Sequence, residues 1–411
     1  MTADKKKPGA VCRLCRSDRL SRVLELGEMP IGHHLRKDPD GVDALYHLAF
    51  DYCAGCGLLQ ISSPIAAGIL YEAAETYTTS FQNPPHLADV RATILAHTDA
   101  DRAVEIACND GLFLQMLHDG GIGEVAAIEP NPVAAGRARE IGISVETGYL
   151  TLKTAKRLVA ADGQGAFPIV VARHVVEHVD DLAAFFAAVR ELLSADGLFY
   201  MELPWVEPGF ETGNPSVLWE EHLSYFTEPL IRALLARNGF DIIQRRTYAF
   251  GGGTIGFLSR RGEPKTPQWS PGPYDRDFFS RFAGRIAEYA KTLRKVINAY
   301  RTAEWRIALY GAAPRSSTVI NFARAAGLLD MVVDDREEIQ GLYMPGTKIP
   351  ITTLDSLDDR DTLLLMGVGS ENEHKVRRKV VSRLGGRPRF ISLFTPRDAV
   401  ASMNAALELL R

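Results

Sequence analysis

A strand, a tight turn and the start of a helix, all within residues 104–117, place the strongest constraint on the fold of this chain. Residues 104–107 predict the end of a buried strand, and apolar positions at helical spacing follow Gly111. The turn between them consists of small or polar residues, which suit an abrupt reversal: Cys108, Asn109 and Asp110. The stretch therefore predicts one strand–helix unit of a parallel α/β sheet.

An acidic residue closes the next predicted strand. Residues 125–128 are apolar, and Glu129 follows them, 18 residues beyond Gly111. An acid at this place can accept hydrogen bonds from both hydroxyls of a ribose, although the loop lacks the G-x-G-x-x-G fingerprint of dinucleotide sites. Class I methyltransferases, which bind S-adenosylmethionine, resemble this arrangement of an acidic E-I-x-x-N-D-G loop and a later acid. The resemblance implies cofactor contacts from Glu105, the turn residues and Glu129. An ordinary strand–turn–helix with two incidental acids is the alternative.

The same pattern continues as far as about residue 261, where strands and helices alternate and predict a doubly wound sheet. Residues 169–172 form a short apolar strand that delivers Arg173 and His174 at its carboxyl end, where ligands bind in open α/β sheets. We count both as candidate cofactor-binding residues. A helix is expected over 181–193, stopped by Gly197, and a strand over 198–203.

Four of the five cysteines form two C-x-x-C pairs, with 37 residues between the pairs: Cys12, Cys15, Cys53 and Cys56. Two such knuckles can place four thiolates tetrahedrally around Zn²⁺, and a closed four-sulfur site is structural. The separation is longer than in compact zinc ribbons, so an insertion must loop out between the knuckles. A redox pair, or reduced thiols that merely pack, are the alternatives.

The 411 residues predict several domains. We expect a zinc-binding module over 1–64, an α/β core over 65–262, a proline-rich linker with a long helix (275–304) over 263–304, and a second Rossmann-like α/β domain over 305–411. The net charge of −4 gives no electrostatic footprint for nucleic acid. Apolar runs are too short to span a membrane and no secretory signal is evident, so we expect a cytoplasmic protein.

The stretch 219–226, Trp-Glu-Glu-His-Leu-Ser-Tyr-Phe, combines carboxylates with an imidazole between aromatic residues. Histidine suits a general base because its pKa lies near neutral pH, and a neighbouring carboxylate would fix its tautomer. His222 and Glu221 are therefore candidate catalytic residues. A capped helix start at Thr227 is the alternative. A polar-aromatic patch over 77–83 suits a pocket rim. His33 and His34 could reach a substrate, but adjacent histidines on a loop are more often surface residues.

Taken together, these motifs resemble the three-domain sugar C-methyltransferases of deoxysugar biosynthesis. The motifs are the cysteine pairs, Glu105 with Asn109-Asp110-Gly111, Glu129-Pro130, Glu221-His222 with Ser224-Tyr225, Tyr310-Gly311-Ala312, and Pro345-Gly346-Thr347 with Ile349-Pro350. The resemblance implies methyl transfer from S-adenosylmethionine to the third ring carbon of a nucleotide-linked (dTDP) 4-keto-6-deoxysugar. It also implies that His222 is the base, that Glu221 supports it, that Tyr77 lies across the pocket, and that the nucleotide diphosphate binds between the core and the carboxy-terminal domain.

Three departures from the family pattern fall on the expected acceptor side. In the family motif I-Y-H-E-H, the Tyr and the first His are replaced here by Trp219 and Glu220. The family motif H-G-G-S-L-R corresponds to Phe-Gly-Gly-Gly-Thr-Ile at 250–255, without its His and Arg. The family motif A-W-N corresponds to Gly-Val-Gly at 367–369. These departures concern the acceptor pocket, whereas the residues expected to bind the cofactor match the family pattern. Methyl transfer to O or N of another metabolite, or a non-catalytic binding protein with this fold, remain the competing hypotheses.

Overall fold

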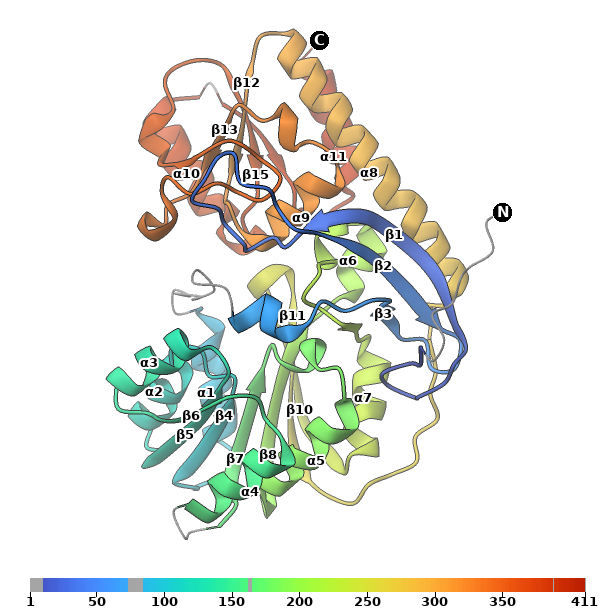
Figure 1. Ribbon diagram of the computed structural model, residues 1–411, viewed down its shortest axis with the longest axis vertical. Helices are drawn as coiled ribbons and strands as arrows, with labels where there is room; N and C mark the ends of the chain where they lie inside the picture. The colour runs from blue at the N-terminus through green and yellow to red at the C-terminus, as the bar shows by residue number, and fades with distance from the viewer. Residues whose placement is uncertain (1–9, 73–83, 162–164, 387, 411) are drawn as a thin grey trace.

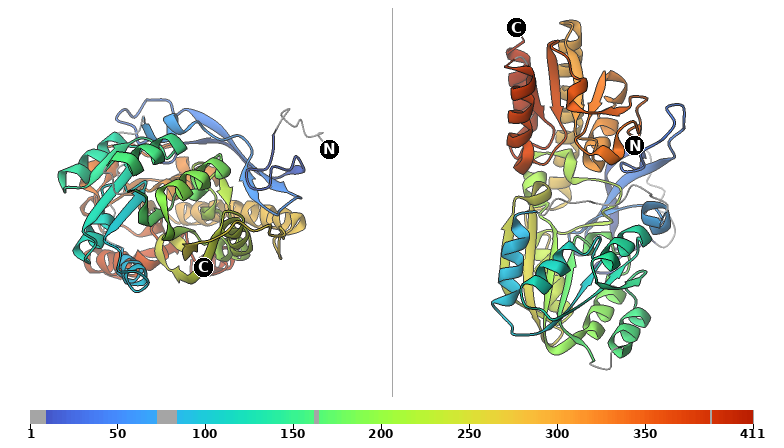
Figure 2. Two further views of the ribbon diagram at one scale, coloured as in Figure 1. Left: turned by 90° about the horizontal axis from the view of Figure 1, so that it is seen from below. Right: turned by 90° about the vertical axis from the view of Figure 1, so that its left-hand side faces the viewer.

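The computed structural model describes residues 10–72, 84–161, 165–386 and 388–410, and three β-sheets organise them (Figure 1). The seven-stranded and five-stranded sheets form two α/β units, one above the other in Figure 1, and the four-stranded amino-terminal sheet lies along one side of both. The right-hand view of Figure 2 shows the same stacking from the side. The amino-terminal part of the chain therefore has access to both larger units.

The amino-terminal sheet is antiparallel and includes a strand from far along the chain. Its strands, in spatial order, are β1 (Leu20–Pro30), β2 (Leu45–Cys53), β3 (Leu59–Ile61) and β9 (Ser224–Tyr225). Leu59 pairs with Tyr225, which lies in the predicted catalytic stretch 219–226, two residues after Leu223. The sheet thus holds the loop of Glu221 and His222 against the cysteine-rich module.

The expected insertion between the two cysteine pairs is the hairpin of β1 and β2. Its connecting segment, residues 31–44, reaches the carboxy-terminal unit, as Figure 1 shows. The backbone of Arg36 exchanges two hydrogen bonds with Tyr343, of 2.9 and 2.8 Å, and Lys348 forms an ion pair of 2.9 Å with Asp40. The insertion therefore joins the amino-terminal and carboxy-terminal units.

The central sheet has the strand order β10-β11-β8-β7-β4-β5-β6 and is parallel except for β11. The strands are β4 (Arg102–Ile106), β5 (Glu124–Glu129), β6 (Ser144–Thr147), β7 (Phe167–Arg173), β8 (Leu193–Pro204), β10 (Phe240–Tyr248) and β11 (Thr254–Arg261). The helices are α1 (His86–Leu95), α2 (Leu112–Asp119), α3 (Pro132–Glu140), α4 (Leu152–Ala161), α5 (Leu182–Leu192), α6 (Glu207–Thr212) and α7 (Glu228–Arg237).

Along β7, Ile169 and Val171 enter the core shared with α1, α2 and α3, whereas Val170 and Ala172 enter the core shared with α5 and α7. Both faces are buried, which confirms the predicted doubly wound sheet.

The carboxy-terminal sheet is fully parallel, with the order β14-β13-β12-β15-β16. Its strands are β12 (Arg306–Tyr310), β13 (Met331–Val333), β14 (Ile351–Thr352), β15 (Thr362–Met366) and β16 (Arg389–Ser392), and its helices are α8 (Arg276–Thr302), α9 (Pro314–Phe322), α10 (Ser370–Leu384) and α11 (Ala399–Glu408). The long helix α8 serves two cores. Phe279, Phe282 and Ile286 pack with the amino-terminal sheet, and the residues from Tyr289 onward pack with β12 and β15.

One predicted boundary is wrong. Helix α5 ends at Leu192, because Leu193 is already extended and pairs with Phe167, so β8 begins there and Gly197 lies inside the strand. The long helix α8 begins where the sequence predicts, since Asp275 is its N-cap and accepts a 2.7 Å hydrogen bond from the backbone of Phe278. Among the described helices, none is both long and apolar enough to cross a membrane.

Candidate active site

The predicted cofactor loop lies at the carboxyl end of β4 and turns directly into α2. Gly111 caps the helix with φ +82°, a backbone conformation that favours glycine, and a Cβ there would also require the side chain of Ile143 to move, since it would lie 2.4 Å from its Cδ1. Asn109 also has a positive φ of 55°, which asparagine tolerates better than most residues. This backbone places Cys108, Asn109 and Asp110 in the wall of a cavity.

Glu129 closes β5 beside this loop and is 5% exposed. Its two carboxylate oxygens accept backbone hydrogen bonds of 2.8 Å from Asn109 and Asn131, one each. Burial raises the pKa of Glu129, and these two N–H groups oppose that rise. A carboxylate offers about four acceptor positions, so the group is held in place with capacity left for the hydroxyls of a ribose. The residues present therefore fit the nucleoside part of S-adenosylmethionine.

Glu105 and Arg173 form an ion pair beneath the loop, with 2.9 Å between Nε and Oε1. Burial raises the pKa of Glu105 to about 7, although Arg173 opposes the rise. Arg173 also lies over the ring of Phe113, 4.5 Å from its centroid, and lines the cavity. In the described structure Glu105 is fully buried and is not part of the cavity wall, so it supports the loop from behind.

His174 follows β7 and faces two buried carboxylates. Its Nδ1 lies 3.4 Å from Glu177, and its Nε2 lies 3.3 Å from Glu202. Burial alone would lower the pKa of His174, but the two carboxylates outweigh it and raise the pKa to about 9. The ring is therefore a cation at neutral pH, at the edge of the sheet where the cofactor loop ends.

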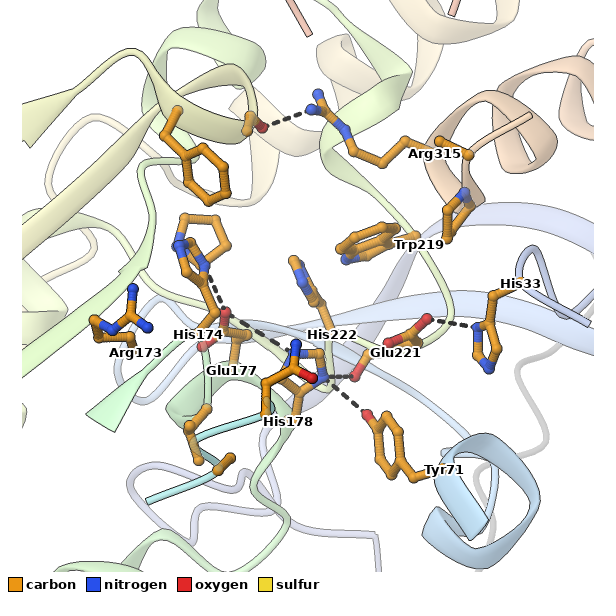
Figure 3. Close-up of a pocket in the computed structure, with 18 of the residues that line it drawn as sticks. His33, Tyr71, Arg173, His174, Glu177, His178, Trp219, Glu221, His222 and Arg315 are labelled. Carbon is orange, nitrogen blue, oxygen red and sulfur yellow. Dashed lines mark hydrogen bonds and ion pairs between the residues drawn. The ribbon is translucent and has the colours of Figure 1, made fainter. Parts of the chain in front are cut away.

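His222 lies in the cavity wall and is 6% exposed. Burial and the neighbouring His178, His174 and Arg315 lower its pKa well below the usual value, so the imidazole is neutral at pH 7. Its ring packs at right angles to Trp219, with centroids 4.5 Å apart, and near His178, with centroids 5.0 Å apart (Figure 3). The neutral imidazole has a free nitrogen lone pair, but its lowered pKa makes it a weaker base than the near-neutral pKa expected from the sequence would give.

His178 and Glu177 belong to the helical turn Val176–His178, and both lie next to His222. One nitrogen or oxygen atom of each of the three side chains lies within 4.8 Å of the others. Nδ1 of His178 lies 2.9 Å from the hydroxyl of Tyr71 and 2.9 Å from the backbone oxygen of Glu221. Neither His178 nor Tyr71 was among the predicted catalytic residues. For Tyr71 the reason is that it lies on an isolated helical turn, Gly68–Glu72, which carries no motif.

Glu221 has a different partner from the one expected. Its carboxylate forms an ion pair of 2.7 Å with His33, as Figure 3 shows, instead of fixing the tautomer of His222. The expectation that His33 is a surface residue is also wrong, since the residue is 7% exposed. The reason is that the segment after β1 folds under the catalytic loop. Tyr77, the third predicted catalytic residue, lies outside the described residues.

A single large cavity connects these groups. Its volume is about 1600 Å³, and it extends from the cofactor loop past His222 to the first turn of the carboxy-terminal unit. There Arg315 donates hydrogen bonds to the backbone and hydroxyl oxygens of Ser216, at 3.0 and 2.8 Å, and to the backbone oxygen of Gly251 at 2.5 Å. Most of the departures from the family pattern line this cavity: Trp219, Phe250, Gly251, Gly252, Gly253, Gly367, Val368 and Gly369.

The four cysteines lie apart from the cavity and close together. Sulfur atoms from the two knuckles approach in pairs, Cys12 with Cys56 and Cys15 with Cys53, each at 3.5 Å. All four lie within 4.8 Å of one another. A tetrahedral zinc with bonds of about 2.3 Å would place its sulfur ligands about 3.8 Å apart, so the group fits the metal. Because four thiolates leave no open position, the site is structural.

Three family models match successive parts of the chain: a zinc binding domain over residues 12–71, a methyltransferase domain over 81–245 and a C-methyltransferase C-terminal domain over 271–391. The C-methyltransferase NovU of Streptomyces niveus is 24% identical over 366 residues, which cover 84% of this chain and 86% of that protein. A ubiquinone biosynthesis O-methyltransferase of Caulobacter vibrioides is 33% identical over 132 residues, which span 29% of this chain and 51% of that protein. Among solved structures, the 1,6-didemethyltoxoflavin-N1-methyltransferase of Burkholderia thailandensis covers 51% of this chain and 97% of its own, at a TM-score of 0.37 and 15% identity.

The sheet order, the cofactor loop and the matching methyltransferase model define a class I S-adenosylmethionine-dependent methyltransferase that acts on a small molecule. The order of its parts narrows the class. A zinc-binding module, a methyltransferase core and a C-methyltransferase C-terminal domain follow one another, and NovU matches along most of both chains, so the findings support a three-domain C-methyltransferase.

Proposed function

We propose that the protein transfers a methyl group from S-adenosylmethionine to the carbon beside the ketone of a nucleotide-linked deoxysugar. The observation that carries this proposal is His222, a neutral imidazole in the wall of the cavity that begins at the cofactor loop. Methylation of carbon requires a base for an acidic C–H proton, and a ketone next to that carbon makes the proton acidic.

On the donor side, Glu129 would hold the ribose, and Cys108, Asn109 and Asp110 would line the rest of the site, with Arg173 and His174 at the next strand end. Glu105 would act through Arg173. When bound there, S-adenosylmethionine supplies an electrophilic methyl group on a sulfonium.

On the acceptor side, His222 takes the proton from the carbon, and the electron pair of the broken C–H bond is left on the enolate of the ketone. That carbon then forms the new bond to the methyl group, and the sulfonium becomes a neutral thioether. The carboxylate of Glu177, within 4.8 Å, would stabilise the imidazolium that His222 becomes. Glu221 and Tyr77 remain proposed members of this site from the family resemblance.

Arg315 supports the nucleotide-linked part of the proposal. Its guanidinium lines the cavity, and its hydrogen bonds in the described structure go to the neutral oxygens of Ser216 and Gly251. Burial lowers the pKa of Arg315 to about 10, so it stays charged at neutral pH. A positive charge in this position suits the diphosphate of a dTDP-linked sugar.

Methyl transfer to oxygen or nitrogen is the second candidate. The match of the central core to O-methyltransferases favours it, as does the replacement of a tyrosine by Trp219 in the acceptor wall. A carbon acceptor passes through an enolate and an oxygen acceptor does not, so the two reactions differ in the exchange of one C–H proton.

The test uses methyl-labelled cofactor and a panel of nucleotide-linked 4-keto sugars in deuterated water. We expect the wild-type protein to exchange the proton beside the ketone, and His222→Ala to lose both exchange and methylation. His118→Ala, at the outer end of α2, is the control for the loss of an imidazole. Normal methylation without exchange would rule out the carbon route and support the second candidate.

A further inference from the structure

The segment that follows β1 enters the active site from the zinc-binding module. The backbone N–H of Gly32 donates a 2.6 Å hydrogen bond to Oε1 of Glu220, and Nδ1 of the next residue, His33, lies 2.7 Å from Oε1 of Glu221. Thr318 of α9 donates to the other oxygen of Glu220 at 3.2 Å. Three distant parts of the chain therefore meet at the two carboxylates that precede His222.

These carboxylates need a nearby positive charge. Glu220 and Glu221 are adjacent, and each is 2% exposed. Burial, and the repulsion from Glu221, raise the pKa of Glu220. Two neighbouring carboxylates removed from water destabilise the fold unless donors or a cation compensate them. The backbone of Gly32 and the hydroxyl of Thr318 donate to Glu220, and the imidazole of His33 lies against Glu221.

The contacts of His33 indicate an imidazolium. Nε2 lies 2.8 Å from the backbone oxygen of Leu70, and Nδ1 faces the carboxylate of Glu221. A neutral imidazole can donate from one nitrogen only, whereas the cation donates from both. Burial lowers the pKa of His33, but Glu221, Leu70 and Glu220 outweigh it and raise the pKa above its ordinary value. The ring of His34 packs edge-on to that of His33, with centroids 4.7 Å apart.

The position of Glu221 affects His222, the proposed base, and His178, which packs against His222. Its backbone oxygen lies 2.9 Å from Nδ1 of His178, and its peptide bond leads directly into His222. The backbone N–H of Leu223 donates to the backbone oxygen of Glu177 at 2.8 Å. A displacement of the Glu221 side chain would therefore be transmitted to His178 and His222 together.

We propose that His33 is a positioning residue of the active site: carried in by the zinc-binding module, it pairs with Glu221 and so fixes the loop that presents His222 to the acceptor. This inference rests on the proposed role of His222. It gives the amino-terminal module a part in catalysis, because the zinc knuckles and β1 place the histidine under the catalytic loop.

A double-mutant cycle with His33→Ala, Glu221→Gln and the double variant tests the proposal. We expect His33→Ala to lower kcat for methyl transfer by about 100-fold, the size of effect that a displacement of about 1 Å can cause, with a smaller change in KM. In the Glu221→Gln background the same substitution should change kcat less than about threefold, because its partner is already altered. His33→Gln keeps a donor toward Glu221 and should restore part of the rate. His47→Ala, an exposed histidine on β2 of the same module, is the matched control.

Zinc content and the melting temperature are measured for each variant, and hydrogen exchange at the C2 carbon of His222 is followed by mass spectrometry. A positioning role predicts full zinc content in His33→Ala together with a changed exchange rate at His222. Independent effects of the two substitutions on kcat, an unchanged exchange rate, or a loss of zinc would overturn the proposal. The exchange measurement needs no acceptor, so it decides the role of His33 even where the wild-type protein fails to methylate any keto sugar, a result that counts against the proposed function alone.

Discussion

His174 provides a quantitative test of the electrostatics of this site. Its ring lies between two buried carboxylates, 3.4 Å from Glu177 and 3.3 Å from Glu202. The perturbation is His174→Asn, chosen because His174 has a positive φ of 52° and asparagine tolerates that conformation. The substitution removes the titrating group and leaves the backbone in place.

The contribution of His174 to the free energy of unfolding follows from its pKa. The carboxylates overcome the effect of burial and raise the pKa of His174 from 6.5 to about 9 in the folded protein. At 1.36 kcal/mol per pKa unit, full transmission of that difference gives about 3 kcal/mol. The side chain is 29% exposed, so solvent screening reduces the expected contribution to about 1–2 kcal/mol. Because the folded pKa is the higher one, this stability is fully present below pH 6.5 and is lost as the pH rises through about 9.

The assay is denaturant unfolding of the wild-type protein and His174→Asn at a series of pH values from 6 to 10. We expect the wild-type protein to be more stable than His174→Asn at pH 6. The difference in the free energy of unfolding should shrink steadily with pH and become constant above pH 9. His118→Asn, outside the cavity, controls for the loss of an imidazole. A stability difference that is constant over this range, or that grows with pH, would refute the reasoning.

Two further predictions concern the bound groups. Cys56→Ser should lower the zinc content from about one metal per chain to nearly none and reduce the melting temperature, because three sulfur ligands do not complete the tetrahedron. A variant that retains one zinc per chain and an unchanged melting temperature would contradict this prediction. Glu129→Gln should weaken the binding of S-adenosylhomocysteine by about tenfold or more in calorimetry, since a charge-assisted hydrogen bond contributes about 1.5–3 kcal/mol. Glu124→Gln, at the exposed start of the same strand, is the control, and equal affinity in the two variants would argue against ribose binding by Glu129.

Local features of this protein are determined by its sequence. The reversal at Gly111 follows from a backbone conformation that favours glycine. Two C-x-x-C knuckles indicate the four-sulfur cluster, although its 3.5 Å sulfur contacts join one knuckle to the other. The doubly wound sheet follows from apolar strands that alternate with amphipathic helices, and its observed order agrees. The turn and the sheet depend on residues that are near in sequence or that repeat with the period of a helix or strand, and the cluster depends on a cysteine spacing typical of metal sites.

The partners of the candidate catalytic side chains are decided by the tertiary structure alone. A carboxylate next to a histidine in sequence suggests that the two interact, yet Glu221 points to His33, and Glu105 pairs with Arg173 beneath the cofactor loop. The contact between Gly32 and Glu220 joins positions 188 residues apart. No local pattern encodes such a pairing, because it depends on how the hairpin of β1 and β2 packs between two α/β units and on β9 joining its sheet. Burial and neighbouring charges then decide the protonation states. Burial and nearby cationic groups leave His222 neutral, whereas the carboxylates of Glu177 and Glu202 outweigh burial and keep His174 charged.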